Sequence, residues 1–185
     1  FIGASLMPVA SGVFRDMTGI RFEHPVWDAA QCTACGNCYT VCPDSAIPGL
    51  VSSVADVFAT AIQRIEAGGQ PTRFLRRAVR TVEKKLRGQI AGDGVAVRPL
   101  IDAAIAATLA AADAAEQPRL AEEFAALQAV LGEFQWSTTK PYWTRKEKQS
   151  PGSGGLFSIT INPYTCKACA LCVDVCADNA LKMVN

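Results

Sequence analysis

All eight cysteines of the chain fall into two copies of one pattern. Three cysteines follow one another with two residues between each pair, and a fourth comes after three more residues. The first copy comprises Cys32, Cys35, Cys38 and Cys42, and the second comprises Cys166, Cys169, Cys172 and Cys176. Thiolates at this spacing hold [4Fe–4S] clusters, and each cluster needs four of them. The two copies therefore predict two [4Fe–4S] clusters as the cofactors of this chain.

The fourth cysteine of each copy is expected to serve the other copy. In two-cluster proteins with this spacing, the last cysteine of one run binds the cluster of the other run. The first cluster is therefore predicted to be held by Cys32, Cys35, Cys38 and Cys176. The second is predicted to be held by Cys166, Cys169, Cys172 and Cys42. The chemistry that follows is electron transfer, and no residue of the chain is predicted to be catalytic.

Two other uses of eight cysteines are less consistent with the pattern. Disulfide scaffolds are typical of short secreted chains, and here the cysteines are few for the length and no secretory signal peptide is recognised. Zinc sites commonly use separate pairs of Cys-x-x-Cys. A triplet with a fourth cysteine four residues on favours the cluster interpretation, with Pro43 completing the first motif and Ala177 departing from it in the second.

Each motif lies between short stretches that favour strands. Residues 25–27 and 156–161 precede the motifs, and residues 46–48 and 180–184 follow them. Asp28 and Asn162 stand shortly before the first cysteine of each motif, where such residues favour turns. This internal repeat predicts an α+β fold of the two-cluster, bacterial ferredoxin-like type, with a large and mostly helical insertion between the motifs.

The predicted domain order has five parts. Residues 1–23 form an N-terminal arm, 24–48 the first half of the ferredoxin-like domain, 49–134 the helical insertion, 135–155 a linker and 156–185 the second half. Four segments of the insertion have apolar residues at helical spacing. The first apolar face begins at Leu50, the second helix lies between Pro71 and Gly88, the third follows Pro99 and the fourth has Pro118 near its start.

Positive charge is concentrated in the second of these helices, although the net charge of the chain is only +1. This helix carries Arg73, Arg76, Arg77, Arg80, Lys84, Lys85 and Arg87. Such a surface could dock an acidic electron carrier, although charge runs on helices commonly do no more than face solvent. No nucleic-acid partner is expected, because no reader motif accompanies the charge. No membrane span is expected either, because Asp102 and Asp113 interrupt the longest apolar run.

Residues outside the motifs and helices carry weaker signals. Trp136, Tyr142 and Trp143 lie in the predicted linker, and we expect them to pack against a neighbouring surface. His24 is the only histidine and is expected to be structural. The sequence begins with Phe1 and not Met, so we expect a piece of a longer, cytoplasmic polypeptide.

Two stretches resemble the iron–sulfur domain of pyruvate:ferredoxin oxidoreductases, within the family of 2-oxoacid:ferredoxin oxidoreductases. The first joins Pro25-Val26-Trp27-Asp28 to the run from Cys32 through Pro43 to Ile47. The second runs from Ile161-Asn162-Pro163 through Cys176 to Leu181. The helical insertion departs from the compact members of that family.

The resemblance implies a parent enzyme that decarboxylates a 2-oxoacid of the pyruvate type, forms an acyl-CoA and CO2, and passes electrons to ferredoxin or flavodoxin. Thiamine diphosphate, Mg2+ and CoA would bind in the remaining domains or subunits of that enzyme, which is implied to be oligomeric. A stand-alone ferredoxin-type electron carrier and an iron–sulfur subunit of another dehydrogenase are the alternatives. A third alternative keeps the clusters as structural staples only.

Overall fold

The computed structural model describes residue 16 and residues 18–185, and the chain in this range divides into two compact units. One unit runs to Gly49 and resumes at Ile159–Asn185, and we call it the cysteine unit because it contains all eight cysteines. The other, the helical unit, is Leu50–Ser158. Helices and strands are both present, which confirms the predicted α+β class. Within the described residues, no helix combines the length and the apolar character needed to cross a membrane.

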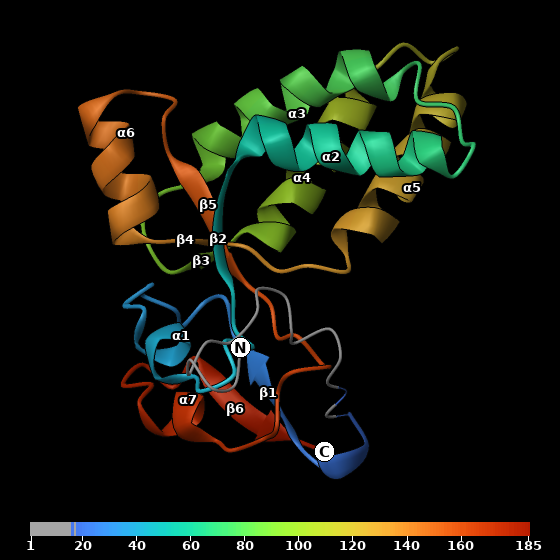
Figure 1. Cartoon of the computed structure of the whole chain (residues 1–185). Helices are drawn as coiled ribbons and strands as arrows, with labels where there is room; N and C mark the ends of the chain where they lie inside the picture. Colours follow the sequence, from blue (N-terminus) through green and yellow to red (C-terminus); the bar gives the residue numbers. More distant parts are fainter. Residues whose placement is uncertain (1–15, 17) are drawn as a thin grey trace, which may run out of the picture. The chain divides into compact units, whose positions relative to one another are not determined.

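The cysteine unit is built from short elements around the two motifs (Figure 1). They are the 3₁₀-helix η3 (Thr18–Ile20), β1 (His24–Trp27), α1 (Asn37–Val41), α7 (Leu171–Asp174) and β6 (Leu181–Val184). Strand β1 pairs antiparallel with β6, with His24 opposite Val184 and Trp27 opposite Leu181. Pro25 and Trp27 are buried and their neighbours are exposed, as expected for a strand with one covered face. The exposed His24 is thus a strand residue.

The predicted N-terminal arm, residues 1–23, is only partly described. Residues 1–15 and 17 lie outside the described part of the chain. Arg21, which follows η3, donates hydrogen bonds from its guanidinium to the carbonyl oxygens of Pro163 and Cys166, the latter at 2.9 Å. The end of this segment is therefore attached to the second cysteine motif.

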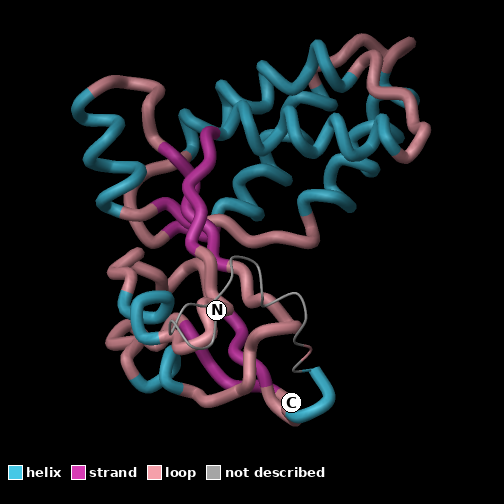
Figure 2. Tube along the Cα trace, in the orientation of Figure 1, coloured by secondary structure: helices cyan, strands magenta, loops and turns pink. Residues whose placement is uncertain are grey.

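A four-stranded sheet belongs mainly to the helical unit. Its order is β2 (Gly49–Ser53), β5 (Gly155–Ile159), β4 (Ser137–Thr138) and β3 (Val95–Ala96), and Figure 2 shows β2 and β5 side by side. The two strands approach closely at Gly155, where an added Cβ would lie 2.5 Å from Cγ1 of Val51.

The prediction that Leu50 begins a helical face is wrong. Ser53 is the N-cap whose side chain accepts a hydrogen bond from the Asp56 amide, so the helix begins after it.

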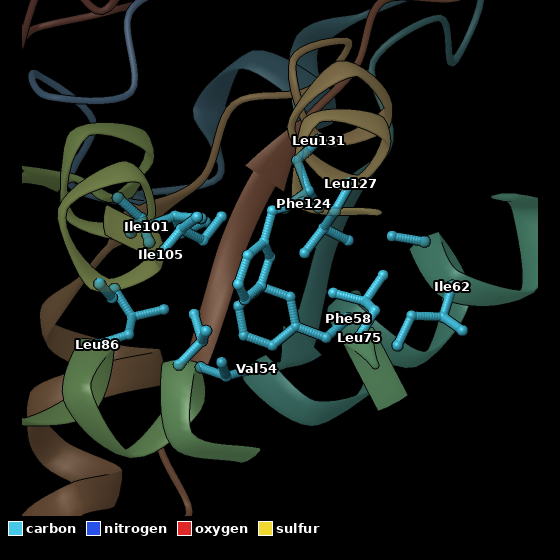
Figure 3. Close-up of a cluster of buried hydrophobic side chains, with 14 of the residues drawn as sticks. Val54, Phe58, Ile62, Leu75, Leu86, Ile101, Ile105, Phe124, Leu127 and Leu131 are labelled. Carbon is cyan, nitrogen blue, oxygen red and sulfur yellow. The ribbon is translucent and has the colours of Figure 1, made fainter. Parts of the chain in front are cut away.

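The four predicted amphipathic helices are present, although the third begins at Val97 and so contains Pro99, which was expected to precede it. They are α2 (Val54–Ala67), α3 (Leu75–Gln89), α4 (Val97–Ala110) and α5 (Gln117–Leu131). Helix α2 ends at Gly68. Pro118 lies in the first turn of α5, where the amide that proline lacks would have no acceptor within the helix. Their apolar faces form one core, with Phe58 and Phe124 each 1% exposed (Figure 3). Burial of one such side chain contributes about 1.5–3 kcal/mol, so this unit has a core of its own.

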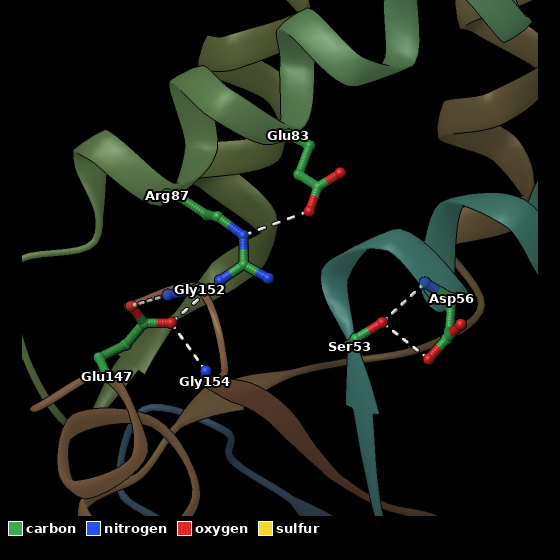
Figure 4. A network of polar contacts seen from close by, with 7 residues as sticks. All are labelled: Ser53, Asp56, Glu83, Arg87, Glu147, Gly152 and Gly154. Carbon is green, nitrogen blue, oxygen red and sulfur yellow. Dashed lines mark hydrogen bonds and ion pairs between the residues drawn. The ribbon is translucent and has the colours of Figure 1, made fainter. Parts of the chain in front are cut away.

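Residues 135–155 differ from the predicted linker. They contain β4, the π-helix η4 (Lys140–Thr144) and α6 (Arg145–Gln149). Trp136 and Trp143 are buried in the core of the helical unit, so the surface against which they pack belongs to the same unit. The Glu147 carboxylate accepts hydrogen bonds from the amides of Gly152 and Gly154 and from Arg87 (Figure 4). The Arg87 guanidinium also lies over the Trp143 ring. These contacts hold the segment in place, and the hydrophobic periodicity of the sequence does not reveal them.

Candidate metal centre

The two cysteine motifs adopt the same backbone conformation. An offset of 134 residues relates Cys32 to Cys166 and every later cysteine to its counterpart. At this offset Ala34 and Ala168 both have φ 59°, and Ser45 and Asn179 have φ 50° and 53°. Left-handed backbone costs an ordinary residue roughly 1–2 kcal/mol. Two loops that adopt this conformation at matching positions therefore share one backbone geometry, in agreement with the internal repeat inferred from the sequence.

Gly36 has the conformation expected for it. Its φ is 86°, and it precedes α1 as Ala170 precedes α7. An added Cβ at Gly36 would lie 2.7 Å from the Tyr39 hydroxyl oxygen. Glycine at this position therefore meets both a backbone requirement and a space requirement.

Hydrogen bonds join each motif to the other. The Asp28 amide donates to the Ala180 carbonyl at 2.8 Å, and its counterpart Asn162 donates to Ala46 at 2.7 Å. Asp28 and Asn162 also form the predicted turns, because their side-chain oxygens accept from the amides two residues ahead, each at 3.0 Å. The segment before one motif is thus attached to the segment after the other.

Side chains repeat this crossed arrangement. The Thr33 hydroxyl, one residue after Cys32, donates to the Asp178 carboxylate at 2.6 Å. Its counterpart Lys167 forms an ion pair with Asp44 at 2.9 Å. Both aspartates stand two residues after the fourth cysteine of the opposite motif. Each three-cysteine loop therefore lies against the tail that carries the other motif's fourth cysteine.

The Cys32 thiol of the first loop lies within electrostatic reach of Cys176. Burial raises the pKa of the Cys32 thiol, and repulsion from Cys35 and Cys176 raises it further. Burial also raises the pKa of Cys38 to about 11, with smaller contributions from Cys32, Cys35 and, from the other motif, Cys172.

The second loop has the matching relation to Cys42. Burial raises the pKa of the Cys172 thiol, and Cys169, Cys166 and Cys42 add to the effect. A cavity of the cysteine unit is lined by Cys42, Cys166, Cys169 and Cys172, together with Lys167 and Asp44. The four cysteines predicted to hold the second cluster thus line one cavity.

This donor set fits iron–sulfur clusters. All eight cysteines are free thiols. Cys32, Cys38, Cys166 and Cys172 are buried, whereas Cys35 and Cys169 are exposed. No group of three or more His, Cys, Asp or Glu side chains in the described part of the chain could hold a single metal ion. A four-iron cluster does not need such convergence, because each of its four thiolates binds a different iron.

Amide hydrogens point at sulfur in both motifs. The Ala46 amide donates to Cys42 Sγ and the Ala180 amide to Cys176 Sγ, each at 3.2 Å. The buried Trp27 side chain hydrogen-bonds the Cys32 thiol and lowers its pKa against the effect of burial. Such donors favour the thiolate and tune the reduction potential of a bound cluster.

Several of these partners were not identified from the sequence. The sequence places Trp27 in a strand and in the family resemblance, and it assigns no role to Lys167. The available signal was the offset of 134 residues, which places an aspartate two residues after the last cysteine in both motifs. A residue so repeated in a turn is a candidate for a contact across the repeat.

Most basic side chains of helix α3 are occupied by contacts within the helical unit. Arg76 pairs with Glu66, Arg77 with Glu116, and Arg87 with both Glu83 and Glu147. Lys85 donates to the Ala107 carbonyl. Arg73, Arg80 and Lys84 are exposed and have no ion pair within residues 18–185. We call these three the basic stripe.

Comparison with known families identifies the first motif. The family model of the 4Fe-4S binding domain matches residues 24–47, which contain β1, α1 and the first four cysteines. The chain is thus an iron–sulfur protein, and the match points to an electron-transfer role. The second motif lies outside the matched range but shares its spacing and backbone. No curated protein and no solved structure matches the chain.

Proposed function

We propose that the cysteine unit is an electron relay that holds two [4Fe–4S] clusters. The observation that carries the proposal is the crossed set of contacts, in which each three-cysteine loop meets the other motif's tail. When bound, such clusters accept and release single electrons. The chain's own part is to hold eight thiolates, to aim amide hydrogens at sulfur and to keep water from the inner thiols.

The distribution of exposed thiols supports a relay more than a structural staple. Each three-cysteine loop has two buried outer members and one exposed middle member, Cys35 or Cys169. An exposed ligand lets a redox partner approach within a short distance of the site. A purely structural site gains nothing from it.

Iron analysis tests the number of clusters. Anaerobically purified protein is expected to contain about eight irons and eight sulfides, since two four-iron clusters demand them. Zinc without a visible absorption band would overturn the proposal.

Paired alanine variants test which thiols share a cluster. Cys35→Ala/Cys176→Ala should lose about four irons, because both residues serve one site. Cys35→Ala/Cys42→Ala should lose nearly all iron, because the two residues serve different sites. The three single variants Cys35→Ala, Cys42→Ala and Cys176→Ala are the controls, and each should lose about four irons. The reverse pattern in the pairs would show that each motif fills its own site.

We further propose that the relay belongs to a 2-oxoacid:ferredoxin oxidoreductase of the pyruvate type. Support comes from the resemblance of Pro25-Val26-Trp27 and the two motifs to that family's iron–sulfur domain. Thiamine diphosphate, Mg2+ and CoA would bind in other domains or subunits, in an oligomeric cytoplasmic enzyme that reduces ferredoxin or flavodoxin. Sequencing of the encoding gene tests this: the reading frame or its neighbours should encode a thiamine-diphosphate-binding domain. A short frame for a lone carrier, or a neighbouring dehydrogenase of another class, would favour the alternatives.

A further inference from the structure

The equivalent positions 33 and 167 differ by a full charge. Thr33 and Lys167 each follow the first cysteine of their motif and each contacts an aspartate of the opposite tail. The Asp178 carboxylate thus has a neutral partner, whereas Asp44 is neutralised by a lysine. We call the two places the Cys32 site, with Cys176 as fourth thiol, and the Cys166 site, with Cys42 as fourth thiol.

The other determinants of potential are closely matched between the sites. The buried thiols are 8% exposed for Cys32 and Cys38, and 8% and 7% for Cys166 and Cys172. The amide-to-sulfur hydrogen bond at the fourth cysteine is 3.2 Å in both. Cluster potential depends on cluster type, net charge, hydrogen bonds to sulfur and exposure. With type, exposure and this hydrogen bond equal, charge is the main remaining difference.

A second cation strengthens the difference. The Arg21 guanidinium donates to the carbonyl oxygens of Pro163 and Cys166, so it lies beside the Cys166 site. Asp16 is within electrostatic reach of Arg21 but is fully exposed, where water screens it. The Cys166 site therefore has two cations and one partnered carboxylate, while the Cys32 site has a carboxylate without a cation among the described residues. Asp28 and Asp174, whose counterparts in the other motif are neutral, are both exposed and add one carboxylate to each side, so the difference remains.

One contact acts in the opposite direction. The Trp27 side chain donates a hydrogen bond to the Cys32 thiol, and at this offset the second motif has Ile161. Such a donor raises the potential of the Cys32 site. It is a neutral dipole, however, whereas the difference at Thr33 and Lys167 is a whole charge in a partly buried place.

We propose that the two sites are redox-inequivalent and that Lys167 and Arg21 make the Cys166 site the first to be reduced. This inference rests on the proposed two-cluster relay. One electron enters from an external one-electron reductant such as dithionite, and no bond forms or breaks. The order sets a direction for the electron. The electron is more stable at the Cys166 site, and an electron at the Cys32 site has the larger driving force for transfer to an acceptor.

Exchange of the two residues tests the proposal. Reductive titration of the holoprotein, followed by electron paramagnetic resonance, should give two midpoint potentials. Lys167→Thr should lower the higher one, with a change of about tenfold in the reduction equilibrium, or about 59 mV for one electron. Thr33→Lys should raise the lower one by a similar factor. Because Arg21 stays beside the Cys166 site, the double exchange leaves one cation and one aspartate at each site, so the two potentials should converge.

A third variant guards against damage to the ligand loops. Asp178→Asn removes the uncompensated charge from a residue outside the three-cysteine loop and should raise only the lower potential. Trp27→Phe should lower only that potential and so identifies it as the Cys32 site.

The failures are distinguishable. Two equal potentials in wild-type protein with eight irons, or Lys167→Thr and Thr33→Lys acting on one and the same potential, would overturn this inference alone. Wild-type protein with four irons or none would overturn the proposed relay itself.

Discussion

The strongest single polar contact of the helical unit is predicted to be the one that Glu123 makes with α3. The Glu123 side chain comes from α5, is buried, and accepts a hydrogen bond from the Leu75 amide at 2.6 Å. Leu75 is the first residue of α3 and is fully buried, so its amide cannot donate a hydrogen bond to water instead. Glu123→Ala removes the acceptor and leaves that amide unsatisfied.

The size of the loss follows from the two contributions that disappear. A hydrogen bond to a charged group contributes about 1.5–3 kcal/mol. A carboxylate at a helix N-terminus adds about 0.3–1 kcal/mol. The free energy of unfolding should therefore fall by about 3 kcal/mol, which lowers the urea midpoint by about 1–2 M at the usual slope for a unit of this size. Glu123→Gln keeps an oxygen acceptor and should lose only about 1 kcal/mol.

Urea unfolding followed by circular dichroism at 222 nm measures this, because α2, α3, α4 and α5 supply most of the helical signal. Glu122→Ala is the matched control: it makes the same substitution one residue earlier on α5, at an exposed position. The control should change the unfolding free energy by less than about 0.5 kcal/mol. Equal losses from Glu122→Ala and Glu123→Ala would refute the argument that the buried carboxylate caps α3.

Three further outcomes are expected. In apoprotein, iodoacetamide should modify exposed Cys35 well before Cys38, and the Cys38 rate should rise with pH towards its pKa of about 11, because only the thiolate reacts; equal rates in mass spectra would contradict this. Removal of iron by a chelator should preserve most far-ultraviolet helicity, since the helical unit has its own core; total loss of helix would show that the units fold as one. Arg80→Glu/Lys84→Glu should slow stopped-flow reduction of an acidic acceptor protein roughly tenfold at low salt, with recovery at high salt and no change in stability; a salt-independent defect would exclude steering by the basic stripe.

The helices could be predicted because their apolar positions repeat and their ends have local signals. Pro118 marks the start of α5, and Gly68 the end of α2. The sheet could not, since β3 and β4 have two residues each and carry no period. Trp136 and Trp143 were recognised as packing residues, but their partners lie on helices far away in the sequence.

The candidate thiols could be recognised from spacing alone because three cysteines of each motif lie in one short loop. What spacing cannot give is the surroundings of the sulfur atoms. The contact of Lys167 with Asp44 and that of Thr33 with Asp178 join residues more than a hundred positions apart, and only the folded chain brings them together. The same holds for Trp27, whose neighbour in space is set by the β1–β6 pair.

The pairing of β2 with β5 also has a consequence for how the chain is made on the ribosome. These strands begin and end the helical unit, so its two ends lie side by side once it has folded. At about 5–20 residues per second, its roughly 100 residues take some 5–20 s to emerge after the first motif. A contiguous unit can fold within that interval and so shorten the gap that the second motif must close. During the same seconds the first four thiols wait for their partners, and this is the stage of synthesis at which oxygen would do the most harm.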